Sequence, residues 1–87
     1  MLYPVLIIHG NQAWYLNFPD FPSLSMMQVG TLGSLIRSAR LVLQEHVDKL
    51  ADKGEPIPEP TLVDRLVLGE GMVLGRVSVV VPEKENR

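Results

Sequence analysis

The stretch from residue 13 to residue 29, AWYLNFPDFPSLSMMQV, decides how this chain folds. In its first part Trp14, Leu16 and Phe18 recur at every second position, so their side chains fall on one face of a β-strand. Tyr15 lies between them and points to the opposite face. The alternation predicts a strand that is buried on one side only.

Two prolines interrupt the stretch directly after this strand. Pro19 and Pro22 have no backbone N–H, so ladder pairing stops across PDFP before LSMMQV resumes as a further strand. Asp20 lies between them, where a carboxylate accepts hydrogen bonds from nearby backbone amides and fixes a turn. We therefore interpret Pro19, Asp20 and Pro22 as a structural kink that joins two strands.

Outward from this kink, further elements can be assigned. MLYPVLIIH predicts a first strand from about Leu2 to His9, and Gly10-Asn11 predicts the turn after it. EPIPEP at 55–60 predicts an extended surface linker, followed by a short helical turn in TLVDRL. MVLGRVSVVV at 72–81 predicts a last strand.

A long helix separates the third and last strands. Thr31 is a candidate N-cap and Gly54 a candidate helix end. Apolar residues follow at helical spacing and predict one buried stripe: Leu32, Leu35, Ile36, Ala39, Leu43, Val47 and Leu50.

The order of these elements predicts the fold class. It is α+β, β-β-β-α-β, with one long helix packed on one face of a mainly antiparallel sheet. Residues 1–81 form one domain, and residues 82–87 form a charged C-terminal tail.

Composition excludes several classes of function. The 87 residues include no cysteine, which removes disulfides, thiolate metal ligands and a thiol nucleophile. A formal charge of −2 and a pI near 5.5 argue against binding nucleic acid through phosphate neutralisation.

The longest apolar run is too short to span a bilayer and no basic segment precedes it, so we expect a cytoplasmic protein. We expect neither a metal nor a cofactor, and we expect a homo-oligomer because small cores are commonly supplemented by assembly.

MLYPVLI, WYLNFPDFP, VGTL, a long helix and GEPIPEP, in this order and spacing, resemble the HicB-like antitoxin family over about residues 1–81. The resemblance implies a partial RNase H-like fold without nuclease activity. It also implies a module that binds and neutralises a small, RNA-cleaving HicA-type toxin. Many members carry a DNA-binding segment after this domain. We expect a short form without one, and so no direct DNA binding by this chain.

No catalytic site is expected. Asp20 lacks companion carboxylates, since Glu45, Asp48 and Asp52 lie on helix positions that point away from the buried stripe. A degenerate RNase H-like enzyme or a small-molecule-binding domain is the alternative function.

Three apolar side chains are candidates for partner binding. Tyr15 lies off the core face, Phe21 lies in the kink, and aromatic residues are enriched among those that contribute most to binding. For Phe21 a second interpretation stays open, in which its ring packs under the kink as part of the core. Leu41 lies near 180° from the buried stripe among polar neighbours, so it should be exposed and could anchor a partner.

Overall fold

The computed structural model describes residues 1–82. It contains four strands and one long helix in the order β-β-β-α-β, which confirms the predicted fold class. The elements are β1 (Leu2–His9), β2 (Trp14–Asn17), β3 (Ser25–Gln28), α1 (Leu32–Lys53), the short 3-10 helix η1 (Val63–Arg65) and β4 (Met72–Ser78). The predicted tail falls largely on residues 83–87, which lie outside the described residues.

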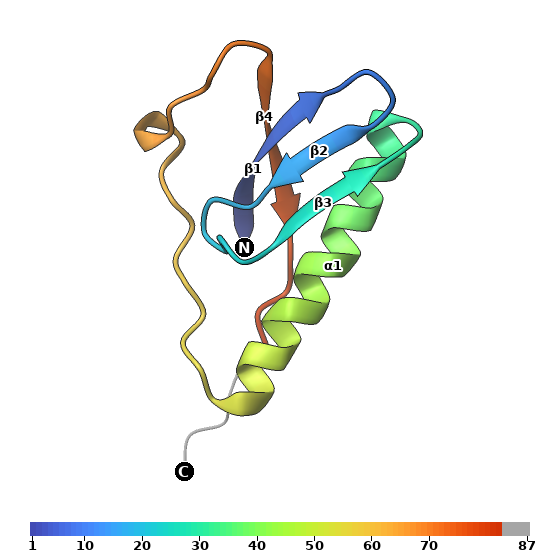
Figure 1. The fold of residues 1–87 in the computed structure, drawn as a ribbon. Helices are drawn as coiled ribbons and strands as arrows, with labels where there is room; N and C mark the ends of the chain where they lie inside the picture. Colours follow the sequence, from blue (N-terminus) through green and yellow to red (C-terminus); the bar gives the residue numbers. More distant parts are fainter. Residues whose placement is uncertain (83–87) are drawn as a thin grey trace.

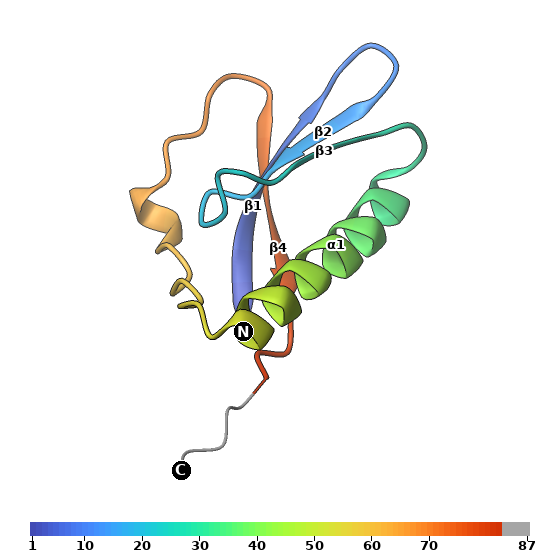
Figure 2. The same cartoon turned by 60° about the horizontal axis from the view of Figure 1, so that its bottom comes forward.

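The strands form one antiparallel sheet in the order β3-β2-β1-β4. Helix α1 lies across one face of this sheet (Figure 2). Residues 54–71 leave the end of α1 and run along the side of the molecule to the start of β4 (Figure 1, yellow to orange). This route leaves much of the opposite sheet face without a covering layer.

Helix α1 begins and ends at the predicted residues. The Thr31 side chain accepts a hydrogen bond from the backbone N–H of Ser34 at 3.1 Å, and Gly54 closes the helix with a left-handed φ of 71°. Such a φ is strained for residues with a side chain, which explains glycine here.

The predicted stripe of α1 is buried at its centre: Leu35, Ala39, Leu43 and Val47. They pack on the inner faces of the strands. Leu32 is the exception, with 41% of its surface exposed, whereas Leu35 in the same turn is fully buried. Its assignment to the buried stripe was therefore wrong.

The remaining predicted connections are also observed. Residues 55–60 have neither helix nor strand, and the predicted helical turn is η1. In the part of the chain that the structure describes, no helix is both long and apolar enough to cross a membrane.

Candidate partner-binding surface

The connection between β2 and β3, residues 18–24, is here called the proline loop. It is built from two successive turns, in which Phe21 N–H donates to Phe18 O at 2.9 Å and Leu24 N–H donates to Phe21 O at 2.8 Å. Strand pairing stops at Asn17 and resumes at Ser25, as the two prolines predicted.

Phe21 lies inside the core, with 4% of its surface exposed. Its ring meets Tyr3 edge-on, with centroids 5.0 Å apart, and meets His46 of α1 edge-on at 5.5 Å. This is the core-packing interpretation that the sequence had left open. A partner-binding role for Phe21 on a free surface is therefore not retained.

The Asp20 carboxylate accepts hydrogen bonds from the linker after α1 and not from the proline loop. Thr61 donates its backbone N–H to both carboxylate oxygens of Asp20, at 3.0 and 3.1 Å, and its hydroxyl to one of them at 2.6 Å. The two residues are 41 positions apart in sequence. The expected structural role of Asp20 is present, but the expected local amide partners were wrong, because the linker supplies the donors.

A second hydrogen bond fixes the same part of the linker. The Tyr3 hydroxyl donates to the carbonyl oxygen of Pro58 at 2.6 Å. Burial raises the pKa of Tyr3 above its ordinary value of 10.0, and the charges of Asp20 and Glu59 raise it further. Together Tyr3 and Asp20 attach residues 58–61 to β1 and to the proline loop.

We expect the Asp20–Thr61 contact to contribute measurably to stability. Thr61→Ala removes the hydroxyl bond and keeps the backbone N–H, so a double-mutant cycle with Asp20→Ala measures the hydroxyl–carboxylate bond, whose coupling free energy should be about 1 to 3 kcal/mol. Urea unfolding of the four proteins measures it. Asp48→Ala on the exposed side of α1 is the control, and strictly additive effects at 20 and 61 would contradict the bond between the Thr61 hydroxyl and the Asp20 carboxylate.

The raised pKa of Tyr3 predicts a loss of stability in alkali. The stabilisation is complete below the unfolded-state pKa of about 10 and is lost as pH rises through the higher folded-state pKa, because ionisation is favoured by unfolding. We expect the free energy of unfolding to fall as pH rises above about 10, and to fall less in Tyr3→Phe. Equal slopes for the two proteins would contradict this.

The other polar candidates do not form a catalytic arrangement. Glu45, Asp48 and Asp52 are exposed on α1. His9 stacks on Trp14 with centroids 3.9 Å apart, and His46 is half-buried against Phe21. Among residues 1–82, no three side chains of the His, Asp and Glu types lie close enough to hold a metal ion.

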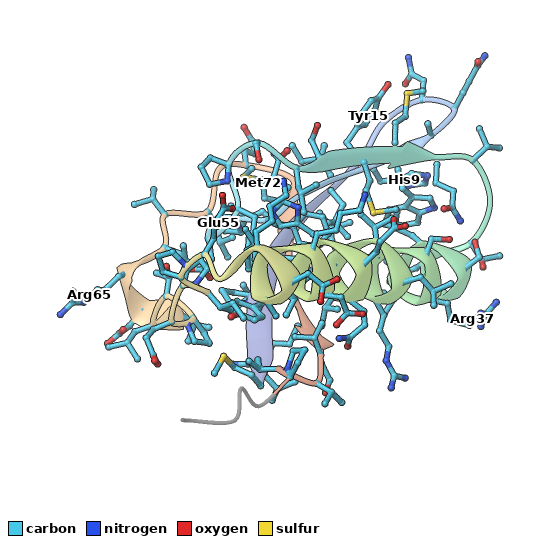
Figure 3. All side chains as sticks on the ribbon, turned by 90° about the horizontal axis from the view of Figure 1, so that it is seen from below. His9, Tyr15, Arg37, Glu55, Arg65 and Met72 are labelled. Carbon is cyan, nitrogen blue, oxygen red and sulfur yellow. The ribbon has the colours of Figure 1, made fainter. Side chains whose placement is uncertain are left out.

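A row of four side chains crosses the sheet face that lies away from α1. Strand register places Met72 opposite Ile8, Ile8 opposite Tyr15, and Tyr15 opposite Met27. The row thus runs from β4 to β3 at one level of the sheet. Tyr15 is 44% exposed and Met27 is 65% exposed. Figure 3 shows Tyr15 projecting away from α1. We call Met72, Ile8, Tyr15 and Met27 the outer row.

The outer row has the chemistry of a protein-binding surface. Methionine adapts its unbranched side chain to irregular partners, and tyrosine offers an apolar ring with a polar tip. The sequence made Tyr15 a candidate for partner binding, but it gave no sign that Met27 and Met72 lie in the same row. Alternation within LSMMQV places Met27 on one face, but only the strand register brings it beside Tyr15.

Leu41 is exposed as predicted, with 72% of its surface accessible. It lies on α1 beside Arg37, Arg40 and Gln44, and the four side chains line a shallow pocket of about 380 Å³. This group is on the helix layer, whereas the outer row is on the opposite face of the sheet. The structure therefore separates the predicted partner residues Tyr15 and Leu41.

Comparison with known proteins gives matches among solved structures only. No family model and no curated protein sequence matches the chain. The N-terminal domain of Burkholderia pseudomallei antitoxin HicB is similar at 25% identity, with a TM-score of 0.79 over 92% of this chain and 99% of that chain. A chain of the HicA3 and HicB3 toxin-antitoxin complex is similar at 24% identity, with a TM-score of 0.72 over the same shares. A chain of a toxin-antitoxin complex from Streptococcus pneumoniae is similar at 19% identity, with a TM-score of 0.80 over 100% of this chain and 79% of that chain.

These matches define the class as small α+β domains in which one helix covers one face of an antiparallel sheet. Within that class the chain is similar in fold to the HicB antitoxin N-terminal domain, in agreement with the resemblance that the sequence had indicated.

Proposed function

We propose that this protein is an antitoxin that binds and neutralises a small, RNA-cleaving HicA-type toxin. The observation that carries the proposal is the match to the HicB antitoxin N-terminal domain, which extends over nearly all of both chains. Two of the other similar chains come from toxin-antitoxin complexes. The protein acts by binding and has no enzymatic role of its own.

The outer row is the surface that we assign to the toxin. It is apolar, it crosses the whole sheet, and no other element of the described chain forms a layer over Tyr15 and Met27. Burial of a tyrosine and adaptable methionines against a partner releases water from a continuous apolar strip. This supports a contact centred on β2 and β3.

The charge distribution supports a basic partner. Residues 54–71 carry four exposed carboxylates, those of Glu55, Glu59, Asp64 and Glu70. Arg65 is the only basic side chain in this segment. An RNA-cleaving protein needs basic groups to approach phosphates, so an acidic flank would accelerate its encounter with this chain.

Isothermal titration tests the proposed binding. The probe is the HicA-type protein encoded beside the gene for this chain, prepared as a catalytically inactive variant. We expect saturable binding at one toxin per chain, weakened at high salt because part of the encounter is electrostatic. If no such neighbour exists, or if the neighbour does not bind at micromolar concentration, the proposal is wrong.

Assembly and catalysis remain predictions with simple readouts. We expect light scattering to give a homo-oligomer, since the free edge of β3 is available to a second copy. A monomer mass at micromolar concentration would contradict this.

The alternative function, a degenerate RNase H-like enzyme, requires magnesium-dependent cleavage that is lost in Asp20→Asn. We expect no such cleavage, because Asp20 is engaged with Thr61.

A further inference from the structure

Strand β4 is an edge strand whose backbone faces β1 on one side only. Met1 and Val79 exchange both backbone hydrogen bonds, at 2.8 and 2.9 Å. This pair shows which residues of β4 direct their backbone N–H and C=O groups toward β1. Pro4 has no N–H and pairs with Arg76, in agreement with that pattern. In an antiparallel ladder the bonded pairs alternate, so the odd-numbered residues of β4 bond to β1. The backbone groups of Leu74, Arg76 and Ser78 therefore point outward from the sheet.

Both ends of this free edge are already closed. The Gln44 carboxamide accepts from Val80 N–H at 2.9 Å and donates to Val80 O at 2.7 Å, as a neighbouring strand would. At the other end Met72 N–H donates to Gly69 O at 3.1 Å. The open stretch is thus limited to residues 74–78, which is long enough for a short added strand.

The surroundings of this open edge are basic. Arg76 lies on β4 itself. On α1, the side chain of Ile36 reaches Gly75 and that of Gln44 reaches Val80, so Arg40, midway between them on the same helix row, lies alongside β4. Arg37 shares the shallow pocket with Arg40 and projects from the side of α1 that lies away from β3 (Figure 3). Arg37 and Arg40 therefore flank the edge on the α1 side, and Arg76 flanks it on the opposite sheet face.

We propose that the free edge of β4 binds an extended, acidic segment of a partner protein as a fifth strand of the sheet. Backbone groups of the segment would pair with Leu74, Arg76 and Ser78, and its carboxylates on the α1 side of the sheet would face Arg37 and Arg40. A second copy of this chain fits less well, because pairing β4 with β4 would bring the same arginines of both copies together. The site is independent of the outer row and of the proposed antitoxin function.

Amide hydrogen exchange measured by NMR tests the proposal on the full chain. The probe is a capped peptide of alternating residues, Glu-Val-Glu-Val-Glu, and the control is the same peptide with lysine in place of glutamate. At free peptide of about ten times Kd, exchange at the Leu74, Arg76 and Ser78 amides should slow about tenfold. The Gly75 and Val77 amides, which already bond to β1, should change little.

Charge reversal gives the second readout. Arg37→Glu with Arg40→Glu should weaken glutamate-peptide binding by about tenfold, since each exposed pair contributes modestly. Lys49→Glu with Arg65→Glu makes the same change of net charge elsewhere and should alter binding less than about twofold. Equal binding of the two peptides, protection at β3 in place of β4, or protection of the β4 amides in a dimer of the chain alone would each overturn the proposal.

Discussion

Phe21→Ala should lower the free energy of unfolding by about 3 kcal/mol or more, in the range for removing a buried phenylalanine. The melting temperature should then fall by about 12 °C or more for a domain of this size. The reason is the position of the ring, which contacts β1 through Tyr3 and α1 through His46 while itself belonging to the proline loop. Its removal leaves a cavity where three parts of the fold meet.

Tyr15→Ala is the matched control for this loss of stability. It also removes an aromatic ring, but from an exposed position on the outer sheet face. Thermal melts followed by far-ultraviolet dichroism should give a much smaller shift for Tyr15→Ala. If Phe21→Ala melted within about 3 °C of Tyr15→Ala, the ring would not be the core contact described, since about 3 kcal/mol is a far larger shift at this size.

The second large effect concerns affinity for the toxin. Tyr15→Ala should weaken binding of the neighbouring HicA-type protein by about 2 kcal/mol or more, close to thirtyfold, as for an aromatic residue central to an interface. The variant should remain folded. Calorimetric titration and melting on the same preparation separate this loss of binding from a loss of structure.

Leu41→Ala distinguishes the two exposed surfaces. Leu41 lies on α1 and the outer row lies on the opposite face of the sheet, so Leu41→Ala should leave the toxin affinity within about twofold. Unchanged affinity in Tyr15→Ala with a large loss in Leu41→Ala would assign toxin binding to the helix. That result would contradict the assignment to the outer row.

Most of the fold could be predicted from local patterns. Alternation in residues 13–18, the two prolines, and the cap residues Thr31 and Gly54 each act within a few positions, and each element is found where they indicated. Leu32 was assigned wrongly because helical periodicity gives the direction of a side chain but does not show which side chains pack over it.

The candidate site was less predictable, because it depends on contacts between distant residues. Nothing near Asp20 in sequence indicates that Thr61 supplies its hydrogen bonds. Phe21 had two open interpretations, and only the packing of Tyr3 and His46 around it decides between them. The outer row likewise requires the register of three strand pairs, which a single sequence does not specify.

An RNA cleavage assay tests whether this protein neutralises the toxin. The active HicA-type protein encoded beside this gene is incubated with RNA while the purified chain is added in increasing amounts. We expect cleavage to fall in proportion to the added chain and to stop near one chain per toxin, and we expect Tyr15→Ala to need a large excess for the same effect. Cleavage that continues undiminished in about tenfold excess of the folded chain would contradict the antitoxin function.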